Sequence, residues 1–273
     1  MDREPKHFKD SHVHTSSSHD GKSMIEEYLA VAAERGVDEI TFTDHYDIYD
    51  GVKSRLQTLD IDRCYLSYLG QTAGVDLATH FGIEIGLRPE VEKQIKDMVK
   101  EHREFDFIIG SSHITCGKDM SMDPSFFAGY TRNQAYTRYF EEVLENIRMY
   151  DDEFDVYGHL DYVVRYGGYA SKIIDYTEFK NVLDQILAIL IKKGKGIEIN
   201  TSGIRYGLAS PHPNKEILAR YRELDGRIIT IGSDAHCVDH LAGDFDVAYQ
   251  MAKEAGFNEV AVFEKREPRF VRI

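Results

Sequence analysis

The sequence predicts an α/β barrel whose functional residues stand at the carboxyl ends of parallel strands. Short apolar runs alternate with amphipathic stretches of helical period along the 273 residues, a pattern that favours parallel strands linked by helices. About seven such strand–helix units at this length fit a barrel better than an open sheet. Most of the apolar runs end in His, Asp or Glu, which is where barrel enzymes carry their active sites.

Each element is expected from its periodicity, because strands are short apolar runs and helices repeat their apolar residues every three or four positions. The helix that begins at Met24 stops before Gly36, a typical helix terminator. The expected strands are 10–14, 39–43, 79–86, 105–110, 155–158, 196–200, 227–232 and a terminal strand at 259–263. The expected helices are 24–35, 60–78, 91–102, 133–150, 176–193, 215–224 and 240–255, with loops at 115–130 and 163–170. No repeat or Pro/Ser-rich linker divides the chain, so we expect a single domain over residues 1–273.

The first strand carries the pattern that points to metal binding. Side chains alternate between the two faces of a strand, so Asp10, His12 and His14 project together. Two imidazoles on one face can hold a metal ion if later strand ends supply further ligands. Later strand ends do carry such residues: His45, Glu84, His113, His159, Asp161, Asp234 and His236.

Several positions leave more than one interpretation open. His19 and Asp20 compete for one ligand role, because adjacent residues rarely face the same ion, and this Ser-rich segment could also be only a turn. Glu84 lies between Gly82 and Gly86, which either leave room for ions bridged by its carboxylate or mark a bend. Asp44 points away from His45 and is expected to orient an imidazole. The remaining histidines are interpreted mostly as solvated or structural: His7, His80, His102, His212 and His240.

The candidate ligands together predict a centre of several metals. They are His12, His14, Asp20, His45, Glu84, His113, His159, Asp234 and His236. Imidazoles and carboxylates without a thiolate suit Zn, Mn or Fe(II), and the set is too large for one ion, so we expect two or three divalent ions. A hydroxide that bridges two such ions is a nucleophile at neutral pH. Asp161, Asp234 and His236 are the candidates for handling a proton.

Two arginines follow strand ends in segments expected to be loops. The planar guanidinium groups of Arg165 and Arg205 could each hold two oxygens of a phosphate, although either could be an ordinary surface arginine. Glu198 and Asn200 share a strand face and are available to a substrate amine or hydroxyl.

The formal net charge of −14 argues against nonspecific binding to nucleic acid or anionic lipid. No apolar window is long enough to span a bilayer, and the first residues are polar. We therefore expect a cytoplasmic enzyme that acts on a small phosphorylated substrate, and the sequence leaves its oligomeric state open.

The H-x-H-T opening, the strand end Thr43-Asp-His45, Glu84, His113, Gly-His159 and Gly-Ser-Asp-Ala-His236 resemble the polymerase and histidinol phosphatase (PHP) superfamily. The resemblance covers essentially the whole chain. It implies a distorted (β/α)7 barrel with a trinuclear metal centre. One metal would be held by His12, His14, Glu84 and Asp234, a second by Asp20, His45 and His236, and a third by Glu84, His113 and His159.

Within the superfamily, the length, Gly158-His-Leu-Asp161 and Asn200-Thr-Ser-Gly-Ile-Arg205 resemble the stand-alone L-histidinol-phosphate phosphatases. The resemblance implies a metal-dependent phosphomonoesterase of L-histidine biosynthesis. The alternatives are a phosphodiesterase or nuclease on the same scaffold, a phosphatase for another small phosphomonoester, a C–N hydrolase, and a metal-binding domain without turnover. The C–N hydrolase is disfavoured because no lysine stands at a strand end.

Overall fold

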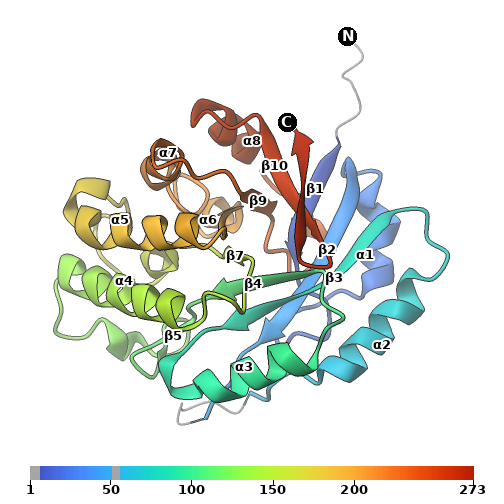
Figure 1. Cartoon of the computed structure of the whole chain (residues 1–273), viewed down its shortest axis with the longest axis horizontal. Helices are drawn as coiled ribbons and strands as arrows, with labels where there is room; N and C mark the ends of the chain where they lie inside the picture. Colours follow the sequence, from blue (N-terminus) through green and yellow to red (C-terminus); the bar gives the residue numbers. More distant parts are fainter. Residues whose placement is uncertain (1–6, 51–55) are drawn as a thin grey trace.

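The computed structural model describes residues 7–50 and 56–273 and shows a curled parallel sheet surrounded by helices (Figure 1). The main sheet has seven strands in the order β1-β2-β3-β4-β7-β8-β9. They are β1 (Phe8–Val13), β2 (Val37–Tyr46), β3 (Ala78–Gly86), β4 (Phe107–Ser111), β7 (Val156–Tyr157), β8 (Gly196–Asn200) and β9 (Ile229–Gly232). Every pairing in this sheet is parallel. The predicted α/β barrel is thereby confirmed.

The sheet curls until its two outer strands meet. A parallel bridge joins Val13 to Ala235, and the backbone N–H of His14 donates to the carbonyl of Ala235 at 2.8 Å. The seven strands therefore form a nearly closed barrel, and the carboxyl ends of the first and last strands lie side by side.

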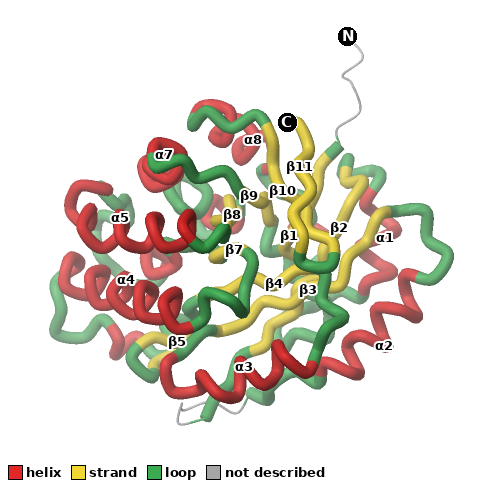
Figure 2. The backbone as a smooth tube through the Cα atoms, in the orientation of Figure 1, coloured by secondary structure: helices red, strands yellow, loops and turns green. Residues whose placement is uncertain are grey.

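The helices pack on the outside of the sheet (Figure 2). They are α1 (Ile25–Ala32), α2 (Ile61–Thr72), α3 (Glu92–Glu101), α4 (Arg132–Met149), α5 (Tyr176–Lys192), α7 (Lys215–Glu223) and α8 (Phe245–Glu254). Helix α4 begins with a capping box, in which Thr131 and Gln134 each satisfy the backbone N–H of the other. The buried side of α4 includes Tyr136, Phe140, Val143, Leu144 and Ile147.

The terminal strand forms a hairpin instead of joining the main sheet. Strand β10 (Glu259–Glu264) pairs antiparallel with β11 (Glu267–Arg272). Phe263 of β10 stacks on Phe107, at the start of β4, with ring centroids 4.9 Å apart. Together with Ile109, Val156 and Ala261 they form a separate buried apolar cluster. The hairpin thus covers the amino-terminal end of the barrel and leaves the carboxyl ends of the strands for the site.

Short elements occupy several segments that were expected to be loops. The 115–130 segment includes β6 (Lys118–Asp119), which pairs with β5 (Ile114–Thr115), and the 3₁₀ helix η2 (Pro124–Phe126). The two segments that carry the arginines are not loops: Arg165 ends η3 (Tyr162–Arg165) and Arg205 ends α6 (Ser202–Arg205). The remaining 3₁₀ helices are η1 (Pro89–Val91) and η4 (Val238–His240). Among the residues that the structure describes, no helix has both the length and the apolar character needed to cross a membrane.

Candidate metal centre

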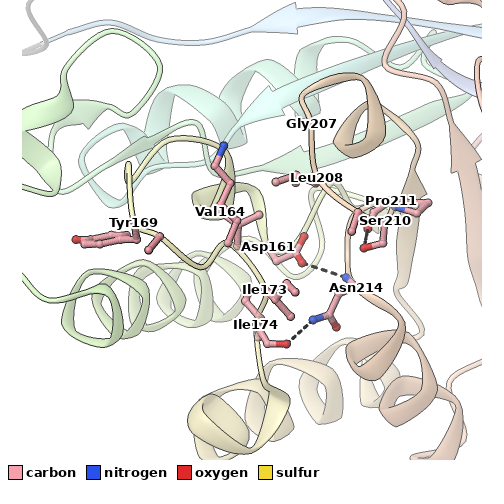
Figure 3. A pocket seen from close by; sticks show the side chains of 13 residues that line it. Asp161, Val164, Tyr169, Ile173, Ile174, Gly207, Leu208, Ser210, Pro211 and Asn214 are labelled. Atoms are coloured by element: carbon pink, nitrogen blue, oxygen red, sulfur yellow. Dashed lines mark hydrogen bonds between the residues drawn. The ribbon is translucent and has the colours of Figure 1, made fainter.

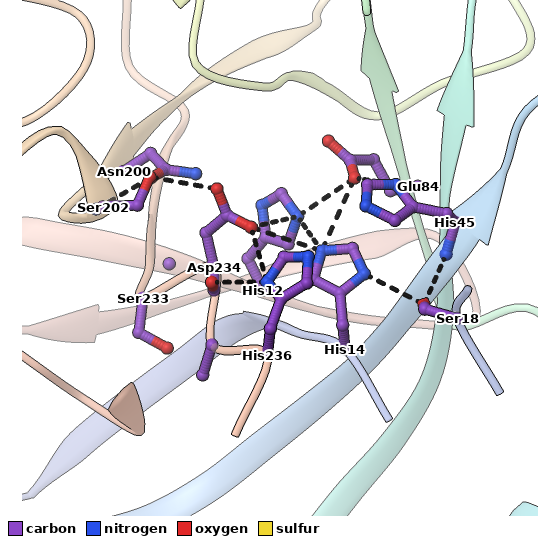
Figure 4. A network of polar contacts seen from close by, with 12 residues as sticks. His12, His14, Ser18, His45, Glu84, Asn200, Ser202, Ser233, Asp234 and His236 are labelled. Atoms are coloured by element: carbon purple, nitrogen blue, oxygen red, sulfur yellow. Dashed lines mark hydrogen bonds and ion pairs between the residues drawn. The ribbon is translucent and has the colours of Figure 1, made fainter. Parts of the chain in front are cut away.

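All nine candidate ligands lie together at the carboxyl end of the barrel. Figure 4 shows Glu84 and Asp234 with the imidazoles of His12, His14, His45 and His236. Three of the candidate ligands lie within strands: His12, His45 and Glu84. Five others follow a strand end by one to four residues: His14, His113, His159, Asp234 and His236. Asp20 comes from the segment between β1 and α1. Parallel strands place these side chains at one edge, so residues far apart in sequence converge there.

Glu84 is the centre of this cluster and is completely buried. Its Oε2 atom lies 2.9 Å from His45 Nδ1 and 3.4 Å from His12 Nε2. Its Oε1 atom lies 2.9 Å from His159 Nε2 and 3.2 Å from His113 Nε2. The two oxygens therefore face two different groups of imidazoles, an arrangement suited to a carboxylate shared between metal ions.

Two further carboxylates complete the cluster. Asp234 Oδ1 lies 3.4 Å from His14 Nε2 and 3.5 Å from His236 Nδ1. Asp20 Oδ2 lies 3.1 Å from His236 Nε2, and its Oδ1 lies 3.7 Å from His45 Nε2. Asp234 has φ of 53°, in the left-handed region that non-glycine residues seldom occupy. Such a backbone at the end of β9 turns the carboxylate toward the imidazoles.

The geometry bears on the choice between His19 and Asp20. His19 Nε2 is 3.8 Å from the Asp20 carboxylate, and its ring lies beside that of His45 with centroids 5.4 Å apart. Asp20, by contrast, reaches both His236 and His45. Asp20 therefore contacts the imidazoles of two candidate ligands, whereas His19 contacts the Asp20 carboxylate and the His45 ring.

The glycines on either side of Glu84 do not leave space for ions. A Cβ atom on Gly86 would lie 1.9 Å from Asp47 Oδ1. On Gly82 it would lie 2.8 Å from the carbonyl oxygen of Phe107. Gly86 instead admits the Asp47 carboxylate, which accepts a hydrogen bond of 3.1 Å from His113 Nδ1. Asp47 was not among the predicted site residues, since it follows the end of β2 with no pattern of its own.

Two more imidazoles, in addition to His113, have a hydrogen-bond partner on the ring nitrogen that faces away from the cluster. His12 Nδ1 lies 2.6 Å from Glu198 Oε1, and His14 Nδ1 lies 3.2 Å from Ser18 Oγ. Because Ser18 Oγ donates its proton to Asp44 at 2.6 Å, it accepts from His14. As predicted, Asp44 helps to orient an imidazole, that of His14, because it accepts the proton of Ser18. Glu198 contacts the imidazole of His12 directly.

These partners fix which ring nitrogens are free. A histidine that donates through Nδ1 leaves a lone pair on Nε2. The Nε2 atoms of His12 and His14 are 3.0 Å apart, and those of His113 and His159 are 3.4 Å apart. His45 Nδ1 and Glu84 Oε2 lie 2.9 Å apart, yet neither has a hydrogen-bond partner. Buried ring nitrogens and carboxylate oxygens that converge this closely fit divalent metal ions.

The buried carboxylates and imidazoles of the cluster shift one another's pKa values. Burial lowers the pKa of His12, but the carboxylates of Glu198 and Glu84 more than offset this and hold the pKa of the imidazole well above its ordinary value. Burial raises the pKa of Glu84, yet the imidazoles of His113, His12 and His45 hold it well below its usual range. Burial, together with nearby His45 and His236, lowers the pKa of His14 well below its ordinary value.

The structure separates Asp161 from the candidate ligands. Its Oδ1 atom accepts a hydrogen bond from His212 Nδ1, and its Oδ2 atom accepts one of 3.0 Å from the backbone N–H of Asn214. His212, interpreted from sequence as solvated or structural, is completely buried and also contacts Arg165. An isolated histidine between two prolines carries no periodic signal, so this role was not visible in the sequence.

Both predicted arginines reach the end of β9. Arg165 Nη2 lies 3.3 Å from Asp234 Oδ2 and donates to Ser202 Oγ. Arg205 donates to the carbonyl oxygens of Ser233 at 3.2 Å and Asp234 at 2.8 Å. Arg165 therefore touches the carboxylate of the candidate metal centre, whereas Arg205 braces the backbone beneath it.

A cavity of about 340 Å³ lies next to Asp161 (Figure 3). Its wall includes Val164, Ile173 and Leu208, together with Asn214, whose side chain donates to the carbonyl of Ile174 at 2.7 Å. The segments that follow η3 and α6 thus enclose a mostly apolar space beside the Asp161–His212 pair.

Comparison with known proteins places this geometry in context. A family model described as PHP domain matches residues 10–202. The chain is 31% identical over 257 residues to a protein of Clostridium acetobutylicum named probable histidinol-phosphatase, covering 94% of this chain and 97% of that protein. It is 27% identical to the histidinol-phosphatase of Lactococcus lactis subsp. lactis, with 93% of each chain covered.

Among solved structures, it superimposes with a TM-score of 0.83 on a histidinol phosphate phosphatase from Lactococcus lactis subsp. lactis complexed with zinc, L-histidinol and phosphate. That match has 26% sequence identity and covers 95% of this chain and 98% of the other.

Proposed function

The chain belongs to the PHP domain family, and from this premise we propose that it is a histidinol-phosphatase, which hydrolyses L-histidinol phosphate to L-histidinol and phosphate. The observation that carries the proposal is the convergence of six imidazoles and three carboxylates beside Arg165. The similar crystal structure, complexed with zinc, L-histidinol and phosphate, supports the same substrate for this chain.

We propose that the residues hold metal ions in three groups around Glu84. The first group is His12, His14, Glu84 and Asp234. The second group is Asp20, His45 and His236, and the third is Glu84, His113 and His159. When bound, divalent ions of this kind polarise phosphoryl oxygens and activate water as a nucleophile. His45 faces both Glu84 and Asp20, so it stands between two of these groups.

The chain's own side chains provide the remaining chemistry. In this proposal, Arg165 binds phosphate oxygens at the side of the cluster where Asp234 and Ser202 lie, because its guanidinium already points there. Arg205 reinforces the positive potential from beneath the β9 end. Asp234 and His236 are the proposed carriers of the proton that the attacking water gives up and that the leaving alkoxide oxygen takes up. Asp161 lies behind Arg165, in contact with His212 and Asn214.

We also propose that residues 1–273 act as one domain. The family match ends at residue 202, yet Asp234 and His236 lie beyond that point and complete the cluster. The last strand of the barrel, β9, therefore belongs to the same functional unit as the first.

The test is the release of inorganic phosphate from L-histidinol phosphate by protein loaded with Zn²⁺ or Mn²⁺. We expect activity that disappears after complete chelation and returns when the metal is restored. A phosphodiester such as bis(p-nitrophenyl) phosphate serves as the comparison substrate and should be cleaved far more slowly. Faster cleavage of the diester would favour the nuclease alternative, and activity unaffected by chelation would exclude the mechanism.

A further inference from the structure

Arg165 is held on three sides before any substrate arrives. Its guanidinium lies between the rings of Tyr162 and Tyr206, at 4.7 and 4.4 Å from their centroids. Its Nε–H donates to His212 Nε2 at 3.0 Å. Only 5% of its side chain is exposed. A long side chain normally samples many rotamers, so this enclosure removes most of the freedom that phosphate binding would otherwise have to restrict.

The hydrogen bonds behind Arg165 run in one direction. His212 Nε2 accepts from Arg165, so the ring proton is on Nδ1, which donates to Asp161 Oδ1. Asp161 can only accept as a carboxylate, and its other oxygen receives the backbone N–H of Asn214. The carboxylate therefore fixes the tautomer of His212, and that tautomer presents an acceptor to Arg165.

We propose that Asp161 and His212 are positioning residues that set the orientation of Arg165 for binding a tetrahedral phosphate. The inference rests on the proposed function, because it takes the ligand of Arg165 to be the substrate phosphate. With Nε engaged by His212 and the ring stacking fixing the plane of the guanidinium, Nη2 faces Ser202 and Asp234. The phosphate oxygens thus meet donors in a fixed fork instead of a mobile cation.

Asp161→Asn tests this direction of hydrogen bonding. The backbone N–H of Asn214 requires an oxygen, so the new amide NH₂ faces His212 Nδ1. The imidazole must then carry its proton on Nε2, where it confronts the Nε–H of Arg165. We expect a ten- to hundredfold rise in the KM for histidinol phosphate and in the Kd for inorganic phosphate, with kcat changed less.

A double-mutant cycle and NMR spectroscopy distinguish positioning from mere structural support. We expect Asp161→Asn to cost no further phosphate affinity in an Arg165→Ala background, because its whole effect passes through that arginine. In Asp161→Asn the proton of the His212 ring should move from Nδ1 to Nε2, so the ¹⁵N chemical shifts of the two ring nitrogens should be reversed relative to the wild type. Asp155→Asn is the matched control, because Asp155 is a buried carboxylate at the opposite end of β7 that pairs directly with an arginine, Arg266, at 2.9 Å. This variant should lower stability and leave phosphate affinity unchanged.

Substitution of the histidine gives a second, independent reading. His212→Gln offers a carbonyl that can still accept from Arg165, whereas His212→Leu offers none. We expect Gln to stay within a fewfold of wild-type phosphate affinity and Leu to lose at least about tenfold. Equal losses in the two variants, or a full additional loss from Asp161→Asn in the Arg165→Ala background, would overturn the inference.

The phosphate Kd is measured by calorimetry on metal-loaded protein, so this outcome is separate from the proposed function. A wild-type protein that fails to hydrolyse histidinol phosphate would refute the function while leaving the test of Arg165 intact.

Discussion

Glu198 lies directly behind His12, with 2.6 Å between Glu198 Oε1 and His12 Nδ1. Both side chains are buried. A Cβ atom on Gly232 would lie 2.3 Å from Glu198 Oε1 and 2.4 Å from His12 Cβ. The absence of a side chain at position 232, on the neighbouring strand, is therefore what allows the two residues to meet. A carboxylate in this position fixes the ring and makes the metal-facing nitrogen more basic.

Glu198→Gln should weaken metal binding. The amide keeps the shape but lacks the charge that stabilises an electron-rich His12, so we expect metal affinity to fall by about ten- to hundredfold. Competition with a chelating dye measures the dissociation constant. Glu39→Gln, at the amino-terminal end of the barrel, is the matched control and should bind metal as the wild type does. Equal affinities in all three proteins would show that Glu198 has no such role.

Gly86→Ala should disturb the His113 side of the centre. The added methyl group would overlap Asp47 Oδ1, so Asp47 must move away from His113. We expect a loss of about 1–3 kcal/mol in the free energy of unfolding, together with a lower metal stoichiometry. Gly70→Ala, on α2 with nothing within 4 Å of the new Cβ, should instead add up to about 1 kcal/mol. Urea denaturation and metal analysis give both readouts, and retention of full metal content in Gly86→Ala would contradict the expectation.

Arg205→Ala should lower kcat/KM by about tenfold or more, because it removes a charge beside the site and both bonds to the backbone beneath Asp234. Lysine cannot span the two carbonyls, so Arg205→Lys should fall between alanine and wild type. Arg222→Ala removes a comparable bond, to the carbonyl of Gly226 at 3.3 Å, far from the site, and should leave turnover unchanged. Wild-type kinetics in Arg205→Ala would remove this arginine from the proposal.

The contribution of Glu39 to stability should depend on pH. Burial raises its pKa, but hydrogen bonds from His80 and Arg269 more than offset this and hold the pKa below its ordinary value of 4.5. A carboxyl with a depressed folded-state pKa stabilises the protein above its unfolded pKa and loses that contribution as the pH falls. The stability gap between wild type and Glu39→Gln should thus be full at neutral pH and close below about pH 4. A gap that persists in acid would indicate a packing effect instead.

Removal of the metal ions should destabilise the whole barrel. The candidate metal ligands come from strands β1, β2 and β3 and from the segments that follow β4, β7 and β9, so bound ions would connect most of the strands. Free metal at a hundred times its dissociation constant adds about 2.7 kcal/mol to the folded state. Thermal denaturation should therefore shift downward after chelation and recover with Zn²⁺. Glu198→Gln should need more metal for the same recovery. A melting temperature that changes neither with chelator nor with added metal would contradict a structural contribution of the ions.

The sequence was sufficient to predict the barrel and the cluster of candidate ligands. Strand periodicity placed His12 and His14 on one face, and parallel connectivity placed the other strand ends at the same edge. His45, Glu84, His113, His159 and Asp234 followed from that rule. The rule works because a parallel barrel gathers all its carboxyl ends.

The parts that could not be predicted depend on contacts without a local pattern. His212 is buried through Asp161, 51 positions earlier in the chain. Asp47 enters a space that Gly86 leaves on the neighbouring strand, where the sequence allowed an ion or a bend. The terminal strand has the apolar character of a barrel strand, but it packs as a hairpin across the barrel's amino-terminal end. Tertiary packing determines each of these three features, so the periodicity of the sequence alone does not predict them.

The bridge between Val13 and Ala235 has a consequence for how the protein is made. On the ribosome, His12 and His14 emerge more than two hundred residues before Asp234 and His236, which share their cluster. A nascent chain therefore displays an incomplete set of imidazoles and carboxylates throughout most of its translation. The two proposed metal groups that contain Asp234 or His236 therefore stay incomplete until the residues after β9 have been synthesised, and only the group of Glu84, His113 and His159 can form earlier.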